Sequence, residues 1–106
     1  MNDYIAQREL VAEFADGARA NVSLRIGVPR LGAHDTWVCH ASIDGLPHRP
    51  LEAHGGDSWQ ALLLALKNVR GAMERFVRSG GKLYFPSDEE SGAVPVAELF
   101  SDDRPE

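Results

Sequence analysis

The side chains best suited to chemistry are a cysteine, several histidines and a short glycine-rich segment. Cys39 and His40 are neighbours in the sequence, as a thiol nucleophile and its base would be. They lie in a run with the alternation of a β-strand, in which successive side chains point to opposite faces. The two side chains therefore cannot touch, and we expect Cys39 to be a buried, small apolar residue.

A second histidine arrangement suggests metal binding. His40 and His48 are expected to face each other on the solvent-exposed side of a hairpin. Two imidazoles do not complete a zinc site, so His54 or Asp44 would have to join them. Because solvated histidines without a ligand are the simpler interpretation, we predict no metal and no cofactor.

The segment Gly55-Gly56-Asp57-Ser58 opens a predicted helix, whose free N–H groups could hold an anion. It lacks the spacing of a P-loop or of a dinucleotide fingerprint, and Asp57 already offers a carboxylate to those groups. We therefore predict a helix cap. No acid pair, Ser-centred elbow or thiol pair accompanies it, so a small enzyme of unknown type ranks third among the function classes.

The helix from Asp57 to Ser79 is the element that positions the others. Asp57 and Gln60 have the spacing of a capping box, and Gly80 is the expected left-handed residue at the C-terminal end. Apolar residues recur between them in steps of three and four, which predicts a single buried stripe. This stripe consists of Trp59, Leu62, Leu66, Val69, Met73 and Phe76.

The opposite helix face offers two candidate binding surfaces. Its C-terminal half is basic, which favours either a nucleic-acid surface or a solvated face that suits the helix dipole. The basic patch consists of Lys67, Arg70, Arg75, Arg78 and Lys82. Leu64 lies among polar neighbours and forms, with Gly71, a strip of the helix surface with few protruding side chains. A partner helix could pack there. The predicted partner surface consists of Leu64, Asn68, Gly71 and Arg75.

Alternating apolar and polar residues predict strands before and after the helix. These strands span residues 4–14, 18–28, 36–42, 46–54 and 82–85. A three-residue loop ending in a left-handed Gly17 joins the first two and pairs Glu13 with Arg19.

Gly45 is expected to serve a second hairpin in the same way. Its register would pair Trp37 with Leu51 inside and His40 with His48 outside. Residues 29–35 are predicted to form a loop.

Composition narrows the class of protein. The chain has 106 residues, one cysteine and a net charge of −5. Residues 87–106 hold seven acids and one base, a net charge of −6, which leaves +1 for residues 1–86. A near-neutral body argues against general nucleic-acid affinity. No signal peptide or membrane-length apolar run is present, so we expect a soluble cytoplasmic protein.

The stretch Gly55-x-Asp57-Ser58-x-Gln60-Ala61-Leu62 carries a resemblance. It resembles a family of small uncharacterised bacterial proteins with this pattern after several strands and a Trp-x-Cys element, here Trp37-Val38-Cys39. The resemblance implies no activity. The order of strands and helix is also similar to HicB-type antitoxins and some toxin-immunity proteins, which is an analogy of fold.

These observations predict one α+β domain at residues 1–86 and an acidic, partly disordered tail at 87–106. The domain is expected to be an antiparallel sheet of four to five strands with one long helix across one face, in the order β-β-β-β-α-β. The favoured function is a non-catalytic protein-interaction module, antitoxin- or immunity-like. The alternative is a nucleic-acid-associated module that uses the basic patch. The tail is expected to dock Val94, Val96, Leu99 and Phe100 on the helix–sheet edge and to mask that patch.

Overall fold

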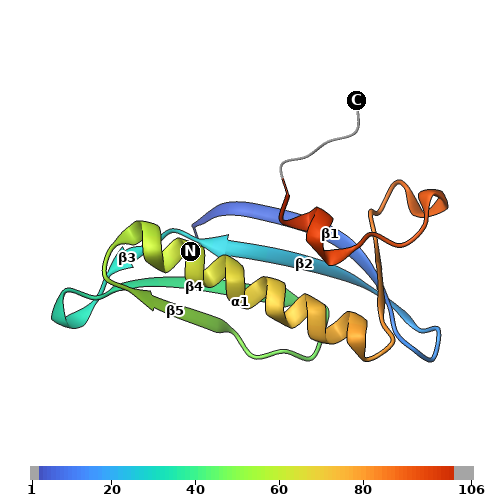
Figure 1. The fold of residues 1–106 in the computed structure, drawn as a ribbon, viewed down its shortest axis with the longest axis horizontal. Coiled ribbons are helices and arrows are strands. Elements are labelled where there is room, and N and C mark those ends of the chain that lie inside the picture. Colours follow the sequence, from blue (N-terminus) through green and yellow to red (C-terminus); the bar gives the residue numbers. More distant parts are fainter. Residues whose placement is uncertain (1–2, 102–106) are drawn as a thin grey trace.

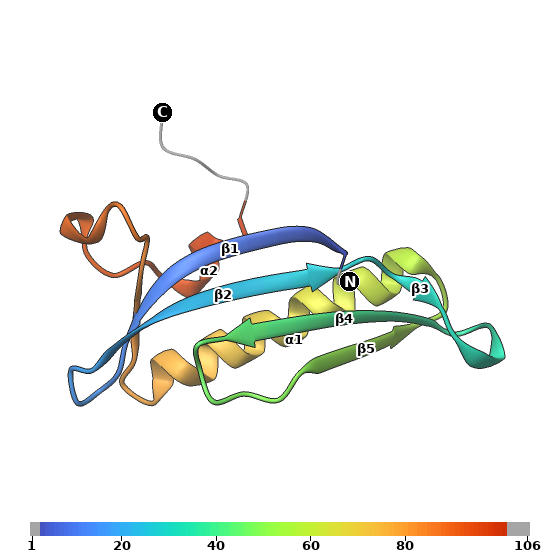
Figure 2. The ribbon, with the colours of Figure 1, turned by 180° about the vertical axis from the view of Figure 1, so that it is seen from behind.

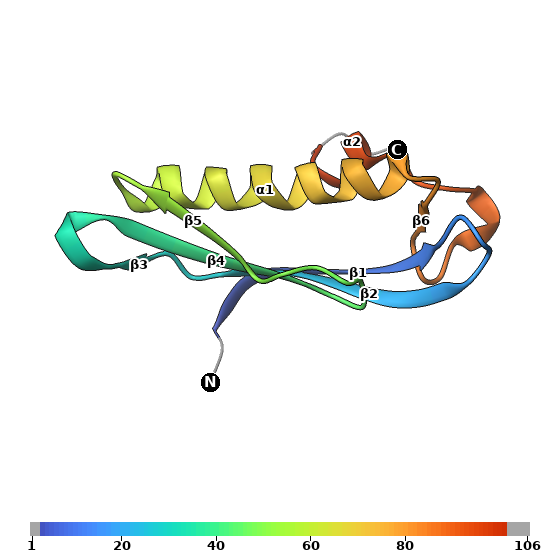
Figure 3. The same ribbon diagram turned by 90° about the horizontal axis from the view of Figure 1, so that it is seen from below.

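The structure is a computed structural model that describes residues 3–101. An antiparallel sheet carries one long helix on one face, and the other face is uncovered (Figures 1 and 3). The predicted α+β class and helix-on-sheet architecture are therefore confirmed. The elements are β1 (Tyr4–Glu13), β2 (Arg19–Gly27), β3 (Arg30–Leu31), β4 (Trp37–Asp44), β5 (Leu51–Gly55), α1 (Ser58–Arg78), β6 (Lys82–Tyr84) and α2 (Val96–Leu99), with 3-10 turns at Ala33–Asp35 and Glu89–Ser91.

The sheet runs β6-β1-β2-β4, and both β3 and β5 also pair with β4. Ala41 of β4 pairs with Ile26 of β2 and with Leu51 of β5, so β2 and β5 lie on opposite edges of β4 (Figure 2). The short strand β3 lies within the segment predicted as a loop. The last strand, β6, returns to pair with β1, which joins the two ends of the domain.

The first hairpin has the predicted register. Glu13 pairs with Arg19, and the nitrogen of Arg19 lies 2.9 Å from the Glu13 carboxylate. Gly17 has a φ of 91°, as the three-residue loop requires. The loop of this hairpin and the pairing on its open face were therefore both predictable from local sequence.

The predicted register of the second hairpin is wrong by four residues. Trp37 pairs with Gly55 instead of Leu51, and His40 pairs with Glu52 instead of His48. Gly45 does have the expected positive φ, 103°. However, Pro47 and Pro50 cannot donate ladder hydrogen bonds, so β5 begins only at Leu51 and the connection is longer than three residues.

The ends of α1 match the prediction. The Gln60 backbone nitrogen donates to the Asp57 carboxylate at 2.8 Å, and the Gly56 nitrogen donates to the Gln60 side chain at 2.6 Å. Gly80 follows the helix with a φ of 103°. Asp57 and Gln60 thus form the reciprocal hydrogen bonds expected of a cap.

The buried stripe of α1 is rotated from its predicted position. Val69 and Met73 are buried as predicted, and Leu62, Leu66 and Phe76 are half-buried. Trp59, by contrast, is 74% exposed. Small side chains let the helix approach the sheet most closely, so three alanines face it with Val69 and Met73, and Trp59 and Leu63 are turned to solvent. The buried residues of α1 are Ala61, Ala65, Val69, Ala72 and Met73.

The C-terminal segment docks as a turn after Pro95. Val94 and Val96 are each only 9% exposed, and Leu99 and Phe100 pack against the core. The cover on the helix–sheet edge is therefore confirmed for these residues. Glu89 pairs with Arg19 of β2, not with α1, so masking of the basic patch stays a prediction. The predicted disorder beyond residue 101 lies outside the described residues, and the division at residue 86 also stays a prediction.

Met73→Ala should lower the free energy of unfolding by about 2–5 kcal/mol, because Met73 is 1% exposed and its removal leaves a cavity. Leu63→Ala is the matched control on the same helix. Leu63 is 52% exposed, so its loss should change stability by less than about 0.5 kcal/mol. Chemical denaturation measures both values, and equal losses would contradict the helix orientation.

Gly45→Ala should destabilise the chain far more than Gly17→Ala. Both glycines have positive φ, so both substitutions cost about 1 kcal/mol in backbone strain. A Cβ at Gly45 would also lie 2.0 Å from the Asn21 carbonyl oxygen, whereas a Cβ at Gly17 meets nothing within 4 Å. Thermal or chemical denaturation of the two variants tests this, and similar losses would contradict the contact between the second hairpin loop and β2.

Candidate functional site

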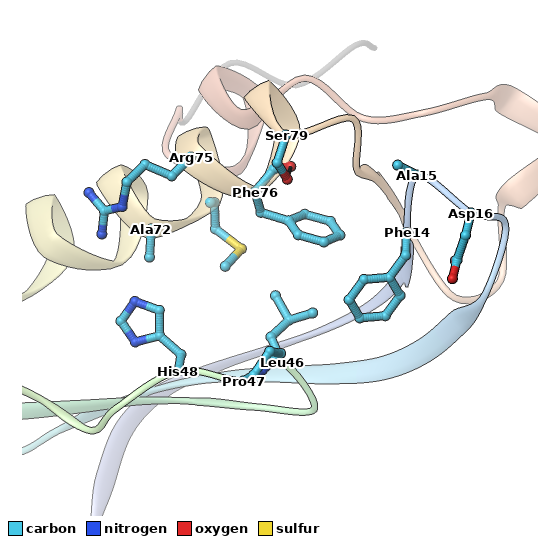
Figure 4. A pocket seen from close by; sticks show the side chains of 11 residues that line it. Phe14, Ala15, Asp16, Leu46, Pro47, His48, Ala72, Arg75, Phe76 and Ser79 are labelled. Atoms are coloured by element: carbon cyan, nitrogen blue, oxygen red, sulfur yellow. Dashed lines mark hydrogen bonds between the residues drawn. The ribbon is translucent and has the colours of Figure 1, made fainter.

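A cavity of about 570 Å³ lies between the C-terminal half of α1 and the two hairpin loops (Figure 4). This volume falls within the range of small-molecule sites. Its walls are mostly apolar. Phe14 and Phe76 form one wall, with ring centroids 5.5 Å apart in an edge-to-face arrangement. The other apolar residues around it are Ala15, Leu46, Pro47, Ala72 and Met73.

Four polar side chains border the cavity, and two of them are already engaged. The Asp16 carboxylate accepts a hydrogen bond from the Ala18 nitrogen at 2.9 Å, and the Ser79 hydroxyl donates to the Phe76 carbonyl oxygen at 2.7 Å. Arg75 and His48 remain, on opposite sides of the cavity near Ala72 (Figure 4).

His48 and Arg75 have unused hydrogen-bonding capacity. His48 Nδ1 lies 2.8 Å from the Arg49 carbonyl oxygen, so it donates there and leaves Nε2 free. Arg75 forms no ion pair with any residue that the structure describes. The cavity thus has an apolar body and one unpaired cation at its mouth.

The outer face of α1 is a second candidate. Trp59 and Leu63, one turn apart, are 74% and 52% exposed, and Val77 further along is 39% exposed. Lys67 and Arg78 lie on the same side of the helix and make no ion pair within residues 3–101. An exposed tryptophan with an apolar neighbour and free cations is the composition of a binding surface.

The predicted basic patch divides into two parts. Lys67, Arg75, Arg78 and Lys82 are exposed, and Arg75 among them also borders the cavity. Arg70 is already engaged, because it pairs with Glu74 at 3.5 Å and its guanidinium carbon lies 5.9 Å from the centre of the Phe100 ring. The patch is therefore no continuous cationic surface.

The predicted partner surface is also changed by the rotation of α1. Leu64 does not stand on the solvent face as expected, because it is half-buried and packs against the core. Asn68 and Arg75 are exposed, and Gly71 is half-buried. Binding at these four residues stays a prediction. Sequence reasoning missed the exposed Trp59 and Leu63, since it assigned both to the buried side or its margin.

Cys39 and His40 point to opposite faces of the sheet, as predicted. Cys39 is fully buried, and its sulfur donates to the Gly27 carbonyl oxygen at 3.4 Å. Burial raises the pKa of the Cys39 thiol above its ordinary value. The side chain is therefore a core residue with little thiolate at neutral pH.

The uncovered sheet face carries His40, His54 and a row of charges. The Glu52 carboxylate lies between two imidazoles, 2.8 Å from His54 Nε2 and 3.6 Å from His40 Nδ1. The predicted His40–His48 pairing is thus replaced by a carboxylate. Among the described residues, no group of three or more His, Cys, Asp or Glu is arranged to hold a metal ion. Beside His40, the buried Ser42 hydroxyl has no hydrogen-bond partner among residues 3–101.

Comparison with known proteins places the chain in a family. The model for the Domain of unknown function (DUF6968) matches residues 6–96. The chain belongs to the DUF6968 family. This match covers both candidate sites and agrees with the resemblance to an uncharacterised family. No curated protein and no solved structure matches the chain. No helix in residues 3–101 has the length and apolarity needed to cross a membrane.

The Cys39 thiol should be unreactive toward an aromatic disulfide reagent in the native protein. Its burial and raised pKa both suppress the thiolate that attacks such reagents. Unfolding in denaturant should expose the thiol and make the reaction fast and stoichiometric. Rapid labelling of the folded chain at neutral pH would contradict the assignment of Cys39 to the core.

Proposed function

We propose that this DUF6968 chain is a non-catalytic protein-interaction module that binds an acidic amphipathic segment of a partner protein along the outer face of α1. The observation that carries the proposal is the exposure of Trp59 and Leu63, with the unpaired Lys67 one turn after Leu63 and the unpaired Arg78 further along the same side of α1. Burying either apolar side chain is worth about 1.5–3 kcal/mol, which is enough to anchor a complex.

The packing of the chain's own C-terminal segment on α1 indicates what kind of partner segment would fit this surface. Its own segment Val96–Phe100 packs beside α1 with Val96 buried, Phe100 over Arg70 and Glu98 exposed. This segment is amphipathic and acidic. Trp59 and Leu63 occupy the preceding turns of the same helix face and have no such cover among the described residues. A second segment of the same character would extend this packing toward the helix start.

Stoichiometric binding of this kind is how antitoxins and immunity proteins act, and we place the module in that class, in the bacterial cytoplasm. A basic helix face with free Lys67 and Arg78 attracts an acidic segment and accelerates its association at low salt. The second candidate is nucleic acid, because an exposed Trp59 beside cations can stack on a base.

The Trp37→Phe variant leaves Trp59 as the sole indole and makes its fluorescence a direct probe of this surface. A synthetic acidic peptide with Leu and Phe at helical spacing should shift the emission to shorter wavelength in a saturable way, because the indole becomes buried. A peptide of the same composition in scrambled order is the control. An unstructured oligonucleotide is the third probe and tests the alternative.

In the same background, Lys67→Glu combined with Arg78→Glu should weaken peptide binding about tenfold or more, because two attractions become repulsions. Lys82→Glu, beyond the helix, is the matched charge control and should have a smaller effect. Equal affinity for the scrambled peptide would contradict the proposal. Preference for the oligonucleotide would establish the nucleic-acid alternative in its place.

A further inference from the structure

We propose that the cavity at the C-terminal end of α1 binds a small apolar carboxylate, with its anionic group on Arg75 and its body between Phe14, Phe76 and Met73. This goes beyond the proposed function, because the cavity is separate from the apolar anchors of that surface, Trp59 and Leu63. Trp59 and Arg75 lie sixteen residues apart on α1, about 24 Å along the axis.

The walls of the cavity select an apolar body. Two aromatic rings, Leu46 and Met73 face a space of about 570 Å³, and the two rings contact each other edge to face (Figure 4). A site of this size accepts a small aromatic or branched molecule without rearrangement. Burial of such a body gives affinity but does not fix its orientation.

Charge fixes the orientation. Arg75 is the cation on the lining, and no described carboxylate neutralises it. The planar guanidinium can bind both oxygens of a carboxylate at once, which a lysine could not do. Asp16 repels an anion at the opposite end of the lining and so favours the same orientation.

The chain does not supply this ligand from its own described residues. The segment containing α2 contacts another flank of α1, at Leu66 and Val69, where Leu99 and Phe100 line a separate and smaller hollow. Glu89 is paired with Arg19 on the sheet. No residue of the described part of the acidic tail lines the cavity at Arg75. No described carboxylate therefore competes with an external ligand for this cation.

The test is titration of the isotope-labelled full chain with phenylacetate and 4-phenylbutyrate, followed by amide NMR. Molecules of this size should bind with dissociation constants in about the millimolar range. Saturable shifts should centre on Ala15, Ala72 and Phe76. The neutral amides of the same two compounds should bind about tenfold more weakly, because they lose the charge-assisted hydrogen bonds. Equal affinity of acid and amide, or no saturable shift, would overturn the proposal.

Arg75→Gln is the decisive variant, since Arg75 is exposed and its loss leaves the core intact. It should weaken carboxylate binding about tenfold and leave amide binding nearly unchanged. The matched control is Arg78→Gln, because Arg78 is also exposed but does not line the cavity. This variant should bind the carboxylates and the amides as tightly as the parent chain does. Equal loss in both variants would show non-specific attraction and reject the site. Trp59→Ala should leave the titration unchanged, so that failure of either proposal is seen separately.

Discussion

The close approach of α1 to the sheet is the contact on which the remaining structure depends. Ala61 and Ala65 are 0% and 1% exposed, so the helix backbone lies nearly against the strands. At the helix start the approach is closer still, because a Cβ on Gly55 would lie 2.5 Å from the Ala61 nitrogen. Only glycine fits there. Because the helix and the sheet are so close here, large side chains of α1 such as Trp59 and Leu63 do not fit between them and lie outside the contact.

Both candidate sites follow from this distribution of large and small side chains. Near the helix start, alanines fill the interface and Trp59 is left in solvent. Near its end, the larger Met73 and Phe76 meet Phe14 and Leu46 around an unfilled space (Figure 4). One end of the helix therefore presents an apolar surface and the other encloses an apolar volume. A partner protein suits the first, and a small molecule suits the second.

The sequence predicts those parts of the fold that depend on local rules. The cap at Asp57, the first hairpin loop and the burial of Cys39 each rest on two or three neighbouring residues. The second hairpin fails because Pro47 and Pro50 delay pairing, and no local rule says by how many residues. The helix orientation fails because the predicted stripe passes through the large apolar residues, with Trp59 in it and Ala61 outside it, and only contact with the sheet shows that Ala61 is the buried one. The cavity joins Phe14, Leu46 and Phe76, whose proximity is purely tertiary.

The pairing of β6 with β1 has a consequence for biosynthesis. Val11 pairs with Tyr84, and Val94 donates a further backbone hydrogen bond to Leu83 at 2.7 Å. When β1 through α1 have left the ribosome, most of the sheet and its covering helix are present. The outer edge of β1 still lacks its partner strand, β6. Open strand edges recruit other chains. Until β6 emerges, the edge of β1 at residues 11–13 stays open to misassembly, and β6 then closes that part of the edge.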